Sequence, residues 1–306
     1  MSMSGLRHAP LKGVLYMLAG VLFFSIMDAT AKWLTGGYPI AQLIFIGRLP
    51  MPVFAIGLAL ASGGLWTLKT HRMGWHLLRA ATGVITFIGF FWCLKLLPLA
   101  DTVALTFASP LIQCALSVPL LGERVGPRRW LAIVVGFIGV IVIVQPSGTG
   151  LGLGALLALM AAFGYALFNN ISRRMSGTET TPSLMLWYSL SLIVATGAIV
   201  PFQWVSPRAE DYGIFILFAA AGTVGQYLMT QAFRYGEASL LAPIDYSALI
   251  WATLLGFLFW QEFPTPTVFA GAAIIVASSL YILHRETRMA RRPLEPAATA
   301  AHLPEA

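Results

Sequence analysis

The chain has 306 residues, of which 58% are hydrophobic and only 10% are charged, and its formal net charge is +7. A soluble domain carries roughly 25% charged residues, so this composition excludes an ordinary soluble protein and predicts a polytopic membrane protein. We interpret the excess of Lys and Arg as a topology signal and expect no nucleic-acid partner.

Apolar stretches of about 20 residues, the length of a bilayer-spanning helix, occur ten times along the chain. In chain order the predicted helices are 12–34, 40–62, 75–97, 101–121, 128–145, 152–172, 183–203, 211–233, 238–260 and 265–284. Lipid offers no partner to free backbone groups, and no stretch alternates polar and apolar residues as a barrel strand would. The sequence therefore predicts an all-α membrane protein with ten transmembrane helices.

The first five predicted helices resemble the last five at a constant offset of 139 residues. Without a gap, this offset pairs Gly13 with Gly152, Gly83 with Gly222, Lys95 with Arg234, Glu123 with Glu262 and Pro127 with Pro266. A repeat with an odd number of spans must insert upside down, and such inverted repeats are typical of secondary carriers. We predict a first repeat over 1–145, an inverted second repeat over 146–284 and a cytoplasmic tail over 285–306.

Basic residues give the orientation of these helices. With a cytoplasmic N-terminus, the inner segments hold most of the 19 Lys and Arg residues, and the outer side keeps Lys32, Lys95 and Arg208. Cytoplasmic loops are the ones that retain basic residues. The turn over 122–129 has three Arg, whereas the equivalent turn over 261–267 has none but keeps its Glu and Pro. We therefore expect a multi-pass protein of the inner membrane with both termini in the cytoplasm.

Neither an enzyme nor a metal site is indicated. The sequence has no Gly-Lys pair, and so no Walker phosphate loop, and it has no His-Glu-x-x-His or Cys-x-x-Cys motif. Cys93 and Cys114 fall within predicted spans, where a free Cys behaves as a small apolar residue. We expect no cofactor and no metal.

Two ionisable residues lie inside the first predicted hairpin. At a rise of 1.5 Å per residue, Asp28 lies about 9 Å from the outer end of its helix and Arg48 about 12 Å from the outer end of the next. Ionisable groups at membrane depth are costly and are candidates for function. Either the two form a structural ion pair, or they bind substrate or a proton directly. Lys32, one helical turn beyond Asp28, could compete for its carboxylate.

Asp245 is the stronger candidate for coupling or binding. It lies about 10 Å into the helix predicted over 238–260, follows Pro243, and has only Arg234 as a basic neighbour in sequence. Such a carboxylate suits proton exchange or recognition of an amine, although a wet cytoplasmic vestibule would also explain it. Pro110 and Pro243 interrupt two predicted helices, and such breaks often expose carbonyl groups to a ligand. Residues at similar depth that could bind substrate, or simply pack, are Trp92, Gln113, Tyr165, Gln226 and Tyr246.

Other conspicuous residues receive structural interpretations. Gly83, Gly222, Gly136 and Gly139 are expected to allow close contact between helices. Glu262, like Glu123, precedes a Pro at the start of a helix, where a carboxylate favours the positive end of the helix.

Several segments resemble the EamA domain of the drug/metabolite transporter superfamily. In the first half these are Phe107-Ala-Ser-Pro110, Leu121-Gly-Glu-Arg-Val-Gly-Pro-Arg-Arg-Trp130 and Gly136-Phe-Ile-Gly139. In the second half they are Ala242-Pro-Ile-Asp-Tyr246, Gly256 and Glu262. The resemblance covers roughly residues 12–284 and implies ten helices in two inverted repeats around a central cavity.

The resemblance also implies a range of cargoes. Members of the family export amino acids or other metabolites, or import compounds such as riboflavin or S-adenosylmethionine. The stretch from Phe24 to Leu34 that contains Asp28 and Lys32, followed by Arg48, is more similar to the uptake carriers.

Our leading hypothesis is a secondary carrier that moves a small organic metabolite by alternating access and is driven by a gradient. The cargo would be an amino acid, a vitamin such as riboflavin, or a nucleoside-like compound such as S-adenosylmethionine. Three alternatives stay open: an exporter of amino acids or drugs, a passive channel lined by rings of like groups, and an intramembrane enzyme with a converging acid, base or metal set. Assembly into a homodimer is also left open.

Overall fold

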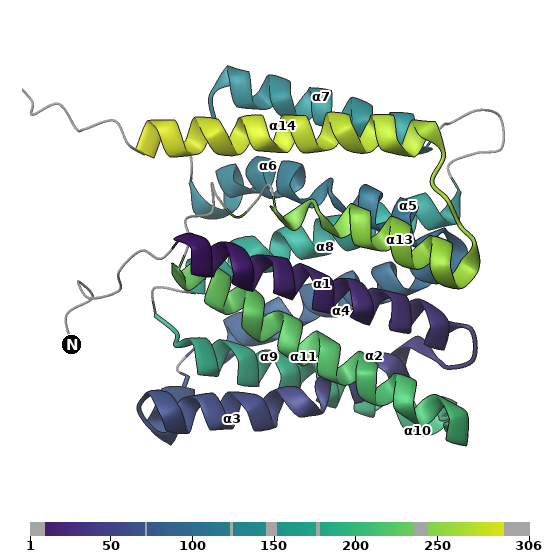
Figure 1. The fold of residues 1–306 in the computed structure, drawn as a ribbon. Helices are drawn as coiled ribbons and strands as arrows, with labels where there is room; N and C mark the ends of the chain where they lie inside the picture. Colours follow the sequence, from purple (N-terminus) through teal and green to yellow (C-terminus); the bar gives the residue numbers. More distant parts are fainter. Residues whose placement is uncertain are drawn as a thin grey trace, which may run out of the picture.

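The computed structural model describes residues 10–70, 72–122, 125–144, 152–175, 178–235, 241 and 244–290. Every regular element in these residues is a helix (Figure 1). The first half contains α1 Pro10–Thr35, α2 Ile40–Arg48, α3 Pro50–Ser62, η2 Leu65–Leu68, α4 Met73–Leu96, α5 Leu99–Thr106, α6 Ser109–Leu121 and α7 Pro127–Val144. The second half contains α8 Leu153–Met175, α9 Thr181–Gly197, α10 Val200–Gln203, η3 Ala209–Asp211, α11 Tyr212–Tyr235, α13 Ala248–Trp260 and α14 Pro266–Ala290.

Eight helical segments of the described chain are long and apolar enough to cross a membrane. They are Leu11–Thr35, Ile40–Ser62, Met73–Leu96, Leu99–Leu121, Pro127–Val144, Leu153–Ser172, Ala209–Met229 and Pro266–Arg285. The remaining two predicted spans are represented by shorter helices, α9 with 17 residues and α13 with 13. The all-helical prediction is confirmed over the described ranges, whereas the number ten remains a prediction.

Proline residues divide several of the predicted helices. α2 ends at Arg48 and α3 begins at Pro50. α5 ends at Thr106, and α6 begins at Ser109 with Pro110 in its first turn. Proline lacks an N–H group and fits the first turn of a helix, where that group has no partner. The predicted break at Pro110 is therefore confirmed, whereas Pro243 lies outside the described residues.

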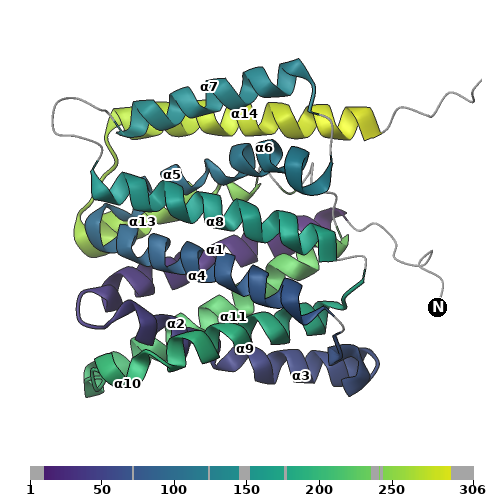
Figure 2. The same cartoon turned by 180° about the vertical axis from the view of Figure 1, so that it is seen from behind.

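Helices of the two halves interleave (Figures 1 and 2). α1 packs along α11, α4 packs along α8, and α7 packs along α14. α2 and α3 contact α9. α13 contacts α1 as α6 contacts α8, and α13 also contacts α5. Exchanging the two halves converts the α1–α11 pair into the α8–α4 pair and leaves the α7–α14 pair unchanged. The packing thus has the twofold pattern that a duplicated fold requires.

Close contacts between these helices use glycine. A Cβ atom placed on Gly139 of α7 would lie 2.6 Å from the backbone oxygen of Gly271 on α14. Cβ atoms on Gly83 and Gly222 would lie 2.5 and 2.9 Å from neighbouring side chains, and one on Gly136 would clash with Leu111. Because small residues let membrane helices approach closely, the packing role predicted for these glycines is confirmed.

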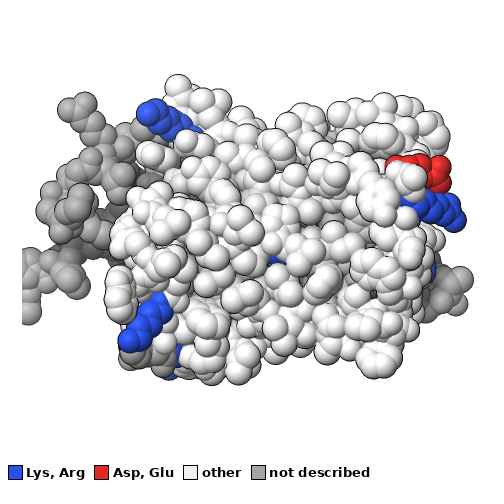
Figure 3. All heavy atoms as spheres, turned by 90° about the horizontal axis from the view of Figure 1, so that it is seen from below, with Lys and Arg blue, Asp and Glu red and all other residues white. Residues whose placement is uncertain are grey.

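Charged side chains are distributed unevenly over the surface of the bundle. The face in Figure 3 carries its acidic and basic side chains almost entirely near its two ends, with a broad uncharged band between them. Large apolar side chains such as Val53, Leu131 and Ile216 are exposed. The start of α1 and the end of α14 lie on the same side of the bundle (Figure 1). An exposed apolar band of this kind suits lipid.

Candidate functional site

A cavity of about 380 Å³ lies at the centre of the bundle, bordered by α1, α2, α4, α8, α9, α11 and the break between α5 and α6. Its volume falls within the range of about 300 to 1,000 Å³ that is usual for small-molecule sites. The aromatic side chains that line it are Phe24, Phe87, Phe90, Phe107, Tyr165, Phe168 and Tyr188. Rings at so many points of the wall suit a ligand with a flat apolar part.

Five of the eight predicted site residues line this cavity, namely Asp28, Arg48, Tyr165, Gln226 and Asp245. They come from α1, α2, α8, α11 and the segment before α13, so the fold brings together residues that are far apart in sequence. The sequence analysis selected them by their depth within separate predicted helices, because polar groups near the middle of the membrane converge on one site in a carrier.

The other three predicted residues lie around or away from the cavity. Gln113 accepts a hydrogen bond of 3.3 Å from Asn169, which lines the cavity. The ring of Tyr246 packs edge-on against Phe107, with 5.0 Å between centroids. Trp92 is 41% exposed and lies under Lys95, outside the cavity lining. Two residues correspond to about 200° of rotation along a helix, so Trp92 points away from the side on which Phe90 lines the cavity.

Two carboxylates face the cavity. Within the described part of the chain, neither Asp28 nor Asp245 forms an ion pair or a hydrogen bond. Tyr165 is close enough to Asp245 for an electrostatic interaction. Unpaired carboxylates at membrane depth are costly unless a ligand, a proton or water reaches them.

The predicted ion pair between Asp28 and Arg48 is not formed. The guanidinium carbon of Arg48 lies 4.2 Å from the ring centroid of Phe87 and 5.9 Å from that of Tyr188. These are cation–π distances. Arg48 is the last residue of α2, and its side chain lies against rings of α4 and α9.

Lys32 does not compete for Asp28 either, because it binds Glu262. Its Nζ lies 2.5 Å from Oε2 and 2.8 Å from Oε1 of Glu262, and it donates a hydrogen bond of 3.1 Å to the carbonyl of Leu97. The Oε2 atom of Glu262 also accepts a hydrogen bond of 3.2 Å from the backbone N–H of Leu99 at the start of α5. Glu262 therefore binds a helix start, as expected, but that of α5 in the opposite half and not that of its own α14.

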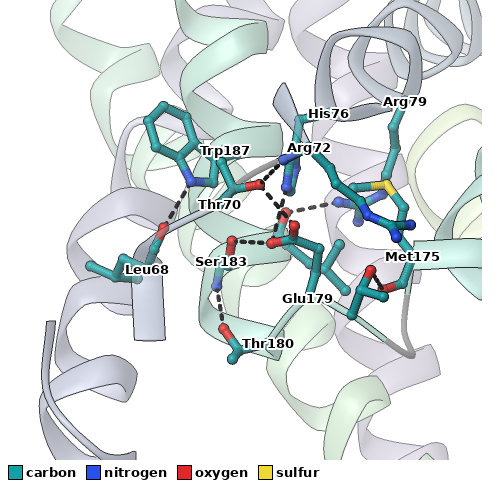
Figure 4. A network of polar contacts seen from close by, with 12 residues as sticks. Leu68, Thr70, Arg72, His76, Arg79, Met175, Glu179, Thr180, Ser183 and Trp187 are labelled. Atoms are coloured by element: carbon teal, nitrogen blue, oxygen red, sulfur yellow. Dashed lines mark hydrogen bonds and ion pairs between the residues drawn. The ribbon is translucent and has the colours of Figure 1, made fainter. Parts of the chain in front are cut away.

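A second polar cluster joins the start of α4 to the start of α9 (Figure 4). Glu179 accepts hydrogen bonds from the hydroxyl groups of Thr70 (2.8 Å) and Ser183 (2.9 Å), and lies 3.5 Å from Nε2 of His76. Burial favours a higher pKa for Glu179, but the hydrogen bonds from Thr70 and Ser183 and the nearby imidazole of His76 outweigh it and lower the pKa below its ordinary value. The sequence analysis did not predict this cluster. The local signal for it is Thr180 beside Glu179, since Thr180 caps the start of α9 by accepting a hydrogen bond from the N–H of Ser183.

Comparison with known proteins agrees with this architecture. The EamA-like transporter family matches residues 11–145 and 152–284, one copy in each half. The riboflavin transporter of Vibrio cholerae serotype O1 is 30% identical over 94% of this chain and 98% of its own. The S-adenosylmethionine uptake transporter of Rickettsia prowazekii is 27% identical over 91% and 94% of the two chains. The pseudopaline exporter of Pseudomonas aeruginosa is 28% identical over 88% and 94%.

One solved crystal structure, 20% identical in sequence, aligns over 92% of this chain and 99% of its own with a TM-score of 0.63, which shows a shared fold. The resemblance noted in the sequence is thus confirmed in both halves. The protein is a multi-pass membrane transporter of small metabolites. It belongs to the EamA-like transporter family of the drug/metabolite transporter superfamily.

Proposed function

We propose that this protein is a secondary carrier that takes up riboflavin, or a metabolite with a similar flat heteroaromatic ring, by alternating access. The observation that carries this proposal is the central cavity, which combines aromatic walls with a few polar groups. Riboflavin transporters of Vibrio cholerae and Rhizobium johnstonii are similar to this chain over at least nine-tenths of its length. An isoalloxazine ring would stack between the aromatic side chains, and its ribityl hydroxyl groups would reach Asn169, Gln226 or a carboxylate.

We further propose ten transmembrane helices, in two inverted repeats over 1–145 and 146–284 and followed by the cytoplasmic tail over 285–306, inserted in the inner membrane with both termini in the cytoplasm. The twofold packing of α1–α11 and α8–α4 supports the duplication. The start of α1 and the end of α14 lie on the same side of the bundle, which supports an even number of membrane crossings (Figure 1). In this arrangement α9 and α13 with their flanking residues supply the two shorter spans.

Alternating access needs one end of the cavity to be closed while the other opens. The contact of Lys32 with Glu262 joins the end of α1 to the segment between α13 and α14, and so links the two halves. Trp33 and Trp260 add an aromatic contact at the same end, with centroids 6.2 Å apart. We propose that these contacts close the outer end and separate when the cavity opens outward.

Asp245 is proposed as the residue that couples transport to a proton gradient. It lines the cavity and has neither an ion pair nor a hydrogen bond among the described residues. Protonation would remove its charge before the cavity changes sides, at a depth where a charge is costly.

The deciding experiment is uptake by proteoliposomes that contain the purified protein. We expect saturable uptake of labelled riboflavin and acceleration by unlabelled riboflavin on the opposite side. Flux that never saturates and shows no such counterflow would indicate a channel. If riboflavin is not moved while amino acids are moved outward, the protein is an exporter and the uptake proposal is wrong. The similarity to the pseudopaline exporter favours this alternative.

A further inference from the structure

Arg48 is a largely buried cation to which no described residue offers an acceptor. Its side chain is only 9% exposed and lines the cavity. Within the described part of the chain, none of its N–H groups makes a hydrogen bond or an ion pair. A guanidinium group has five N–H donors, and the nitrogens of Arg48 are not among the fully enclosed polar atoms without a partner in the described residues, so they stay open to the cavity.

Arg79 shows how the same fold treats a structural arginine. It is also buried, at 7% exposure, and its guanidinium carbon also lies near the ring of Tyr188, 5.0 Å from the centroid. Its Nε donates a hydrogen bond of 2.7 Å to Ser172, and one terminal nitrogen donates a bond of 2.8 Å to the carbonyl of Leu184. The protein thus supplies its own acceptors to the N–H groups of Arg79, whereas the N–H groups of Arg48 remain free to bind a ligand in the cavity.

The surroundings of Arg48 restrict what would bind there. Phe87 lies against the guanidinium at 4.2 Å and restricts its orientation, so its donors form a rigid fork that suits two neighbouring acceptors in one plane. Asp28 and Asp245 line the same cavity, and whenever either is ionised its charge opposes a ligand with a full negative charge. A neutral, flat ring with two adjacent acceptor atoms on one edge meets both conditions.

We propose that Arg48 determines the orientation and the selectivity of transport by hydrogen-bonding one such acceptor edge of the substrate ring. This inference rests on the proposed riboflavin transport. A flavin ring offers two edges of this type, one made of N1 and the C2 carbonyl oxygen, the other of N5 and the C4 carbonyl oxygen. Arg48 binds one of them, and the ribityl chain then lies at a defined end of the cavity.

The test measures equilibrium binding to the purified full chain in detergent with riboflavin, 1-deazariboflavin and 5-deazariboflavin. Each analogue replaces one ring nitrogen by C–H and so removes one of the two acceptors from one edge only. We expect one analogue to bind about tenfold more weakly than riboflavin and the other to bind within about threefold, as fits the loss of one charge-assisted bond. In Arg48→Gln this difference should disappear. Arg48→Lys keeps the charge without the fork and should discriminate less than the native protein.

Lys95→Gln is the matched control, because this lysine lies over Trp92 outside the cavity lining; it should discriminate as the native protein does. If the native protein binds riboflavin and both analogues equally well, the orientation by Arg48 is refuted, even if Arg48→Gln fails to fold. Discrimination that persists in a folded Arg48→Gln protein refutes it too. If the native protein binds no riboflavin at all, the proposed function itself is refuted, and the flavin orientation with it.

Discussion

Substitution of Glu262 tests whether one carboxylate holds the two halves together. In Glu262→Ala, Lys32 loses its counter-ion and the N–H of Leu99 loses its acceptor. The side chains of Lys32 and Glu262 are 9% and 29% exposed, so the pair lies between an exposed pair of about 0.5 kcal/mol and a buried one of about 3 to 5 kcal/mol. We assign it about 2 kcal/mol on that scale. Loss of a helix cap adds about 1 kcal/mol.

The expected total is therefore a loss of about 3 kcal/mol in Glu262→Ala, and about 2 kcal/mol in Glu262→Gln, which still offers an oxygen to Leu99. Thermal unfolding in detergent should show a midpoint several degrees lower, with the alanine variant the less stable. If the loss of about 2 kcal/mol affects only the outward-closed state, the ratio of outward-open to outward-closed protein should rise by about 30-fold. Riboflavin uptake should fall accordingly.

A double-mutant cycle distinguishes this contact from a general effect of the substitution. If the pair is the cause, Lys32→Met and Glu262→Gln together should cost clearly less than the sum of the two single changes. Glu210→Gln is the control, since its pair with Arg208 is 3.7 Å long with side chains 74% and 77% exposed, and little change is expected there. Additive effects of the Lys32 and Glu262 changes would refute the reasoning.

Three further predictions concern coupling, packing and pH. Asp245→Asn should abolish the pH dependence of riboflavin uptake in proteoliposomes while binding persists; an unchanged pH profile would contradict proton coupling at this residue. Gly139→Ala should destabilise the α7–α14 pair by about 1 to 3 kcal/mol, because its Cβ meets a backbone oxygen; Gly57→Ala, with nothing within 4 Å of its Cβ, is the control, and equal melting temperatures would refute the packing argument. Because the pKa of Glu179 is lowered in the folded protein, its stabilising contribution is complete above the ordinary Glu pKa of about 4.3 and is lost as the pH falls through the lower folded value. Stability measured from pH 6 to about pH 3 should thus decline less steeply in Glu179→Gln, and parallel curves for the two proteins would oppose this role.

Several features of this protein follow from local properties of the chain. Apolar length and the scarcity of charge predict membrane helices, because a bilayer imposes both on every span. The same scarcity makes Asp28, Arg48 and Asp245 conspicuous, and all three line the cavity. The break at Pro110 is likewise local, since the pyrrolidine ring cannot continue the preceding helix.

Other features depend on which elements meet in space. Lys32 and Glu262 are 230 residues apart and bind each other. The packing of α2 against α4 brings Arg48 to Phe87, and the rotation of α4 places Trp92 outside the cavity. Depth along a helix can be counted from the sequence because its rise per residue is constant. The direction of a side chain and the identity of its partner depend on how helices pack and where they break, and these are set by contacts between residues distant in the chain.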